Sequence, residues 1–156
     1  MPSTPSSAAF WTDSRGSAYG PQFLSVQQIR AIHAGQVELR GGHPGLRDLA
    51  ALESAAAAPR AGHVAGYFHS FPCGMAACYV YHIAQNQPFV DGNKRTAVAA
   101  ALCFLHVNGY ALRTEAGPEL ERLVLAIAEH AAGKRELEAL LAEHVADVGF
   151  HPMGWW

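Results

Sequence analysis

Chemically useful side chains gather in residues 87–96, whose sequence is Gln-Pro-Phe-Val-Asp-Gly-Asn-Lys-Arg-Thr. Gly92 lets the backbone approach a ligand closely, and Lys94 and Arg95 supply cationic hydrogen-bond donors soon after it. Asp91 adds a carboxylate, which is a ligand that Mg²⁺ accepts together with phosphate oxygens. The combination predicts a phosphate-binding site at which Asp91 holds a magnesium ion.

Two helices are expected to position this stretch. Pro88 stops a helix predicted for residues 74–86, and a second, apolar helix is predicted for residues 93–108. The first N–H groups of a helix have no intrahelical acceptor and lie at the positive end of its dipole, so they favour an anion. The stretch is not a Walker A loop, because Gly-x-x-x-x-Gly-Lys-Ser/Thr is absent. Ordinary turn and N-cap chemistry remains the alternative explanation of its Asp-Gly-Asn sequence.

Helical periodicity covers most of the remaining chain and predicts an all-α fold. The helix at 93–108 is apolar nearly all round, so it is expected at the centre. Residues 61–72 are irregular and could form a mobile flap or a packed loop, and residues 110–113 could be a short extended piece. The other predicted helices span residues 25–41 (with a capping box at Ser25 and Gln28), 48–59, 118–132 and 134–148.

The composition suits a single domain. The chain has 156 residues, half of them hydrophobic, so residues 22–148 are expected to form one core. Residues 1–21 and 149–156 are expected to be tails. The formal charge of −2 gives no nucleic-acid footprint. No apolar run approaches the roughly 20 residues that span a membrane, and no signal-peptide pattern is present, so a cytoplasmic location is expected.

Other kinds of site receive less support. A helix-turn-helix DNA reader needs a recognition helix with a polar face, which the helix at 93–108 lacks. Nine histidines raise the hypothesis of a metal site, but His63 and His69 are six residues apart and do not share a helical face. The cysteines form no Cys-x-x-Cys pair and are expected to be reduced: Cys73, Cys78 and Cys103.

Residues 87–96 also resemble the signature of the Fic/Doc family, His-x-Phe-x-(Asp/Glu)-(Gly/Ala)-Asn-(Gly/Lys)-Arg, and match it everywhere except at Gln87. Residues 41–46, Gly-Gly-His-Pro-Gly-Leu, and residues 93–97 with the later Asn108-Gly109 pair are similar to Doc toxins. The resemblance covers roughly residues 22–145. It implies a compact Fic/Doc helical bundle around the helix at 93–108.

The resemblance also implies roles for single residues. Asp91 would coordinate Mg²⁺, and Gly92, Asn93 and Lys94 would form an anion hole. Lys94 and Arg95 would contact the phosphates of ATP. Lys94 resembles the lysine found at this motif position in the Doc branch of the family. Members of that branch phosphorylate a threonine of elongation factor EF-Tu and are silenced by a Phd-like antitoxin. The alternative is a Fic-type AMP transferase, or a non-catalytic Fic-like protein that binds a nucleotide or a partner.

Gln87 stands where the family has its general base, a histidine. A glutamine amide cannot take a proton near neutral pH, so transfer is expected to be slower by about 10²–10⁴ while phosphate binding survives. Two explanations stay open. Gln87 could be an engineered knockout of a toxic protein, or a natural departure that leaves a binding protein or an enzyme with another base. The spacing of His69 and His82 places neither at position 87.

Overall fold

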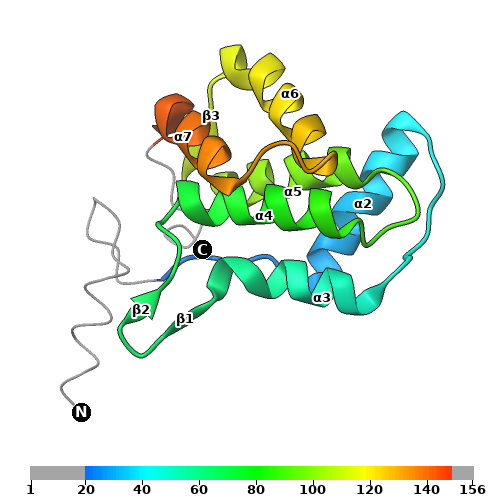
Figure 1. Ribbon diagram of the computed structural model, residues 1–156, viewed down its shortest axis with the longest axis horizontal. Coiled ribbons are helices and arrows are strands. Elements are labelled where there is room, and N and C mark those ends of the chain that lie inside the picture. Colours follow the sequence, from blue (N-terminus) through cyan, green and yellow to red (C-terminus); the bar gives the residue numbers. More distant parts are fainter. Residues whose placement is uncertain (1–19, 149–156) are drawn as a thin grey trace.

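The structure is a computed structural model that describes residues 20–148, and it is mainly helical (Figure 1). The predicted all-α class is confirmed. The predicted tails, residues 1–21 and 149–156, lie almost wholly outside the described residues. The helices are α2 (Val26–Arg40), α3 (Leu49–Ala57), α4 (Cys73–Asn86), α5 (Asn93–Val107), α6 (Gly117–Ala128) and α7 (Lys134–His144), with 3-10 turns η1 (Ala58–Arg60) and η2 (Thr114–Ala116). Two small antiparallel sheets pair β1 (Gly62–His63) with β2 (Gly66–Tyr67), and β3 (Tyr110–Leu112) with β4 (Val145–Asp147).

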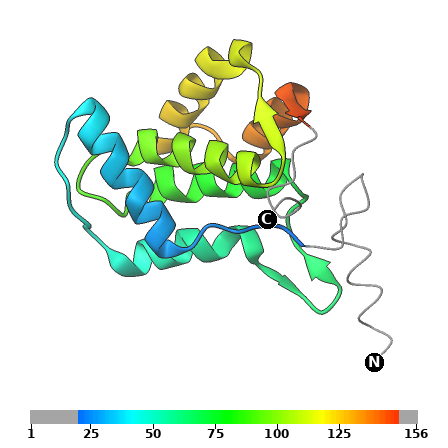
Figure 2. The ribbon, with the colours of Figure 1, turned by 180° about the vertical axis from the view of Figure 1, so that it is seen from behind.

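Helices α4 and α5 run in opposite directions through the middle of the molecule (Figures 1 and 2). Helices α6 and α7 cover one side of this pair, and α3 covers the other, while α2 packs against α5. The helix predicted to be central, α5, therefore shares the centre with α4. Both helices bury small side chains completely, which lets neighbouring backbones lie close together; these include Ala76 and Ala84 on α4 and Ala97 and Ala100 on α5.

Local sequence signals fix the starts of two helices. The Ser25 hydroxyl accepts the Gln28 N–H at 3.1 Å, and the Gln28 side-chain oxygen accepts the Ser25 N–H at 2.7 Å, which confirms the predicted capping box at α2. The Asp48 carboxylate accepts the Ala51 N–H at 3.0 Å and starts α3. These caps matter for the site, because α2 ends and α3 begins on either side of residues 41–48.

The predicted helix ends near the C-terminus were wrong. Helix α6 stops at Ala128 rather than residue 132, and His130 follows with a positive φ of 60°. Helix α7 stops at His144 rather than near residue 148, because Val145–Asp147 pairs with Tyr110–Leu112 as β4. That strand pairing confirms the extended piece predicted after α5. No helix among residues 20–148 is long and apolar enough to cross a membrane.

Candidate active site

The loop between α4 and α5 carries the predicted site residues, and two left-handed residues shape it. Gln87 follows α4 with φ 49° and ψ 59°, and its N–H donates to the Ile83 carbonyl at 3.1 Å. Gly92 precedes α5 with φ 76°, a conformation that glycine adopts without a steric penalty. The backbone between these points turns back on itself, so α5 returns alongside α4.

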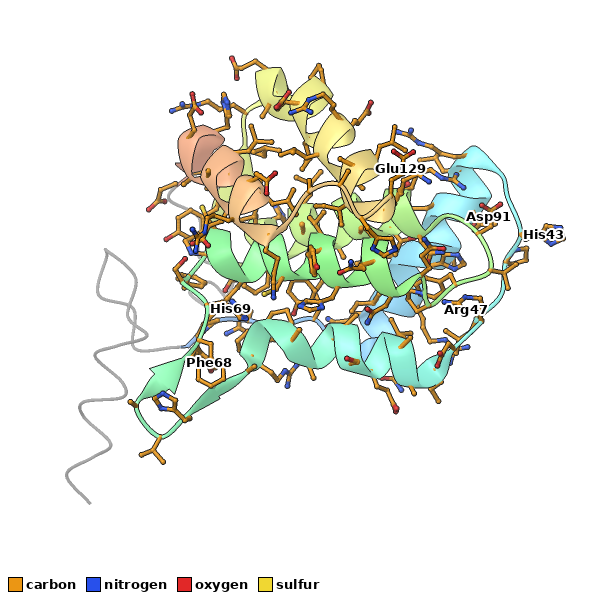
Figure 3. The ribbon with its side chains drawn as sticks, viewed as in Figure 1. His43, Arg47, Phe68, His69, Asp91 and Glu129 are labelled. Atoms are coloured by element: carbon orange, nitrogen blue, oxygen red, sulfur yellow. The ribbon has the colours of Figure 1, made fainter. Side chains whose placement is uncertain are left out.

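Residues 41–48 hold this loop from outside. The Val90 N–H donates to the Gly45 carbonyl at 3.0 Å, and the Arg47 N–H donates to the Pro88 carbonyl at 2.7 Å. Within residues 61–72, considered as a flap or a packed loop, residues 62–67 form the β1–β2 hairpin, which lies at the opposite end of α4 from residue 87. Figure 3 shows this separation, with Phe68 and His69 at one end of the molecule and Asp91 and Arg47 at the other. The segment that covers the candidate site is therefore 41–48.

Asp91 has an exposed carboxylate that is held in place by the backbone. Its Oδ2 accepts the His43 N–H at 3.1 Å and its Oδ1 accepts the Gly92 N–H at 2.8 Å. These two bonds lower the pKa of Asp91 below its ordinary value, and the nearby Arg95 charge adds to the effect. The carboxylate is therefore ionised near neutral pH and keeps lone pairs for a cation.

Three buried or half-buried side chains lock the loop backbone beneath Asp91. The ring of His33, on α2, stacks on Phe89 with centroids 3.8 Å apart, and its Nε2–H donates to the Asp91 carbonyl at 2.7 Å. The Asn93 amide accepts the Phe89 N–H and donates to the Phe89 carbonyl, both at 2.9 Å. The Asn93 side chain therefore holds the loop backbone, while its own backbone N–H has no backbone acceptor among residues 20–148.

The start of α5 faces the same place as Asp91. The first backbone bond of the helix runs from the Thr96 N–H to the Gly92 carbonyl at 3.0 Å, so the preceding N–H groups, those of residues 93–95, have no backbone acceptor among residues 20–148. Arg95 Nη1 donates to the Gly41 carbonyl at 3.1 Å. A β-carbon at Gly42 would lie 2.7 Å from Asp91 Oδ2 and 3.1 Å from Arg95 Nη2, so both charged groups converge on one point.

A groove of about 580 Å³ opens beside this point, between α2, α5 and α6. Its basic end contains Arg40, Lys94 and Arg95, and its apolar wall contains Leu102 and Leu125, which are among the exposed large hydrophobic residues. Lys94 is exposed at the first turn of α5. The phosphate-type site and the groove therefore share the Lys94–Arg95 pair.

Gln87 is exposed at the other end of the loop, and neither histidine considered as its substitute lies beside Asp91. His69 lies at the opposite end of α4, as Figure 3 shows. His82 Nε2 instead accepts a hydrogen bond from Lys134 Nζ, at 3.1 Å, at the start of α7. The structure brings Asp91, Gly92 and Arg95 together but adds no imidazole base at position 87.

Sequence reasoning missed several residues of the site. Arg47 donates from Nε to the Gln87 carbonyl at 2.7 Å and from Nη2 to the Asn86 and Gln87 carbonyls. His43 contributes a backbone N–H, and Gly42 leaves room for two charged side chains. The Gly41-Gly42 pair was the only sequence signal for this packing, because the contacts of Arg47 and His43 arise from tertiary structure.

The charged groups fit a magnesium ion that is shared with a phosphate ligand. Among residues 20–148 no group of three or more His, Cys, Asp or Glu side chains could hold a metal by itself. Mg²⁺ commonly binds through one or two carboxylates and completes its shell with water and substrate phosphate oxygens. A single exposed carboxylate beside an arginine and a helix N-terminus matches this requirement.

Comparisons with known proteins agree with the resemblance in the motif. A family model described as "Fic/DOC family" matches residues 23–105. The protein "Toxin Doc" of Mycolicibacterium smegmatis is 35% identical over 122 residues, which cover 78% of this chain and 90% of that protein. The "Protein kinase doc" of Escherichia phage P1 is 31% identical over 105 residues, which cover 67% of this chain and 81% of that protein. The chain therefore belongs to the Fic/Doc family.

Proposed function

We propose that this chain is a Doc-type toxin of a toxin–antitoxin system, built to move the γ-phosphoryl group of ATP to a protein hydroxyl group. ATP with Mg²⁺ would bind at residues 91–95. The observation that carries the proposal is that Asp91 and Arg95 converge at Gly42, beside the start of α5, where the N–H groups of residues 93–95 have no backbone acceptor among residues 20–148. The "Protein kinase doc" relative supports a kinase reaction.

The residues of the loop divide the work of such a transfer. The N–H groups of residues 93–95 and the Arg95 guanidinium would bind phosphate oxygens, and Asp91 would hold Mg²⁺, which supplies positive charge to the phosphates. The target oxygen bonds to the γ-phosphorus while the bond from phosphorus to the β–γ bridging oxygen breaks, so ADP leaves with the electron pair. The hydroxyl proton must pass to a base.

Gln87 is the weak point of the proposed reaction. Its amide can hydrogen-bond to the target hydroxyl but cannot take the proton, so this chain would bind nucleotide and transfer slowly. A histidine at the same left-handed position would supply a base that titrates near neutral pH. Whether position 87 was altered by design or by descent, the remaining binding groups are the same.

The decisive experiment compares the original chain with Gln87→His and, as a control without a base, Gln87→Asn. Incubation with γ-labelled ATP, Mg²⁺ and elongation factor EF-Tu should label that protein at least about 10²-fold faster with Gln87→His than with either of the others. Label transferred from α-labelled ATP instead would show an AMP transferase and refute the assignment of Lys94 to kinase chemistry. A Gln87→His chain that binds nucleotide but labels nothing would indicate a non-catalytic binding protein.

We propose that a Phd-like antitoxin docks in the groove beside Lys94. We also propose that the chain acts in the cytoplasm. Its basic end and apolar wall fit an amphipathic helix that carries acidic side chains. Leu125→Asp, in the groove, should prevent copurification of a coexpressed Phd-type antitoxin. Leu39→Asp changes an exposed leucine that does not line the groove and should retain the antitoxin. Equal retention by both variants would place the antitoxin elsewhere.

A further inference from the structure

We propose that Arg47 is a positioning residue for the side chain at position 87. Its guanidinium donates from Nε to the Gln87 carbonyl at 2.7 Å and from Nη2 to the Asn86 carbonyl at 2.8 Å. It therefore spans the last residue of α4 and the first residue beyond the helix. This inference rests on the proposed function for its catalytic consequence, but its structural part can be tested without any activity.

The bonds from Arg47 meet a need created by the end of α4. The last carbonyl groups of a helix have no intrahelical donors and lie at the negative end of the dipole, so a guanidinium is a well-matched partner. Gln87 also has a positive φ of 49°, a left-handed conformation that is sterically unfavourable for a residue with a side chain. Bonds to its carbonyl stabilise that backbone conformation, and the backbone conformation sets the direction of its Cα–Cβ bond.

Arg47 is itself fixed by its neighbours. Its own N–H donates to the Pro88 carbonyl at 2.7 Å, so residues 86–88 are held by both the backbone and the side chain of one residue. Asp48, directly after it, starts α3 by accepting the Ala51 N–H. The Asn86 amide in turn donates to the Ala51 carbonyl at 3.2 Å. Arg47 thus connects the end of α4 to the start of α3.

The phosphate-type site uses a different set of contacts. Asp91 is held by His43 and Gly92, and Arg95 is held by the end of α2. Arg47 bonds to none of these three partners in the structure. Its loss should therefore disturb residue 87 more than nucleotide binding, which separates a positioning role from a general effect on folding.

The catalytic test uses the Gln87→His chain, with Arg47→Lys added. Lysine keeps the charge but lacks the planar fork that reaches both carbonyls. We expect kcat to fall about 10–10²-fold, while the KM for ATP stays within about twofold, because misplacing a reacting group lowers the rate without weakening substrate binding. Arg135→Lys makes the same exchange at an exposed site on α7 and should leave both constants unchanged. An unchanged kcat, or a parallel loss of ATP affinity and thermal stability, would overturn the proposal.

The structural test uses the original chain, so it is independent of the proposed function. The ¹³Cα and ¹³Cβ chemical shifts of Gln87 report its backbone conformation, and its amide exchange rate reports the stability of the helix end. Arg47→Lys should move the ¹³C shifts away from left-handed values and increase exchange, while Arg135→Lys should do neither. Unchanged shifts would overturn the inference. If the shifts move but Gln87→His transfers nothing, the positioning role stands and the proposed function fails.

Discussion

The loop after α4 and the contact between α4 and α7 differ in the charge state of their titratable side chains. At the C-terminal end of α4, the loop of residues 87–95 keeps Asp91 exposed and lowers its pKa, so the carboxylate stays ionised. Where α4 meets α7, burial and Lys134 lower the pKa of His82 to about 4, and burial raises the pKa of Cys78 to about 11, so both groups stay neutral. A charged carboxylate that is open to solvent can bind a cation, whereas side chains that pack against another helix are more stable when neutral.

This contrast shows that a large pKa shift does not by itself mark the functional site in this molecule. Several strongly shifted groups, among them His82 and Cys78, lie in the α4–α7 contact, where Lys134 donates to His82 and Ser70 donates to Glu138 at 2.7 Å. Desolvation produces those shifts, and it accompanies helix packing as readily as catalysis. The candidate site is marked instead by charged groups that the backbone holds in solvent.

The largest expected effect tests the α4–α7 contact as a source of stability. Leu137 is fully buried on α7, so Leu137→Ala should lower the free energy of unfolding by about 2–5 kcal/mol. Urea denaturation followed by circular dichroism would measure the loss. Nucleotide affinity at a temperature where the variant is folded should be unchanged, and a parallel loss of affinity would show that the two regions are coupled.

The second test removes the negative charge of Asp91 and leaves the α4–α7 contact unchanged. Asp91→Asn keeps an oxygen that can accept a backbone N–H but loses the ligand for Mg²⁺, so calorimetry should show at least a tenfold weaker Mg²⁺-dependent binding of ATP. The melting temperature should change little, because the side chain is exposed. Glu53→Gln, on the exposed side of α3, is the matched control. Equal affinities for all three chains would refute the assigned site.

Much of the fold could be predicted because its signals are local. Ser25 with Gln28, Asp48 and Pro88 each act on their immediate neighbours, and the corresponding helix boundaries were found from the sequence. The strand β4 was not found, because residues 145–147 continue a helical pattern and become a strand only through pairing with Tyr110–Leu112. Helix-end predictions failed where a distant partner decides the conformation.

The candidate site divides in the same way. Asp91, Gly92 and Arg95 could be predicted because they lie within five residues of sequence. They come together because a helix starts at residue 93. Arg47 was invisible, because nothing in its sequence neighbourhood reveals that α3 begins beside the end of α4. The anion-hole role of Asn93 remains a prediction: its side chain bonds to both backbone groups of Phe89, and its backbone N–H has no backbone acceptor among residues 20–148.

A pH experiment sharpens the contrast between the two regions with a smaller effect. The folded-state pKa of His82, about 4, lies below its ordinary 6.5, so the unfolded chain binds more protons between these values. The contribution of the neutral His82 imidazole to the free energy of unfolding is fully present above pH 6.5 and is lost as the pH falls towards 4. Because His82 takes up a single proton, the free energy of unfolding can change by at most about 1.4 kcal/mol per pH unit from this group. The partial exposure of His82 reduces the slope further.

Urea denaturation at several pH values between 7.5 and 4.5 would measure this slope. His82→Gln should flatten the dependence, and His69, whose pKa is also lowered, leaves a residual slope of the same sign. A steeper dependence after His82→Gln would contradict the neutral, packed state assigned to that side chain.

The smallest expected effect concerns Thr96, a buried residue of α5 close to the binding loop. Its Oγ1 is the buried side-chain polar atom without a hydrogen-bond partner among residues 20–148, and it lies one turn beyond the Gly92 that opens α5. If the hydroxyl only packs, Thr96→Val keeps the shape, removes an unpaired polar atom and should stabilise the fold by up to about 1 kcal/mol. ATP affinity should then stay within about twofold. A fivefold loss of affinity would show instead that the hydroxyl serves the phosphate site, and the boundary between the binding loop and the packed core would move one turn into α5.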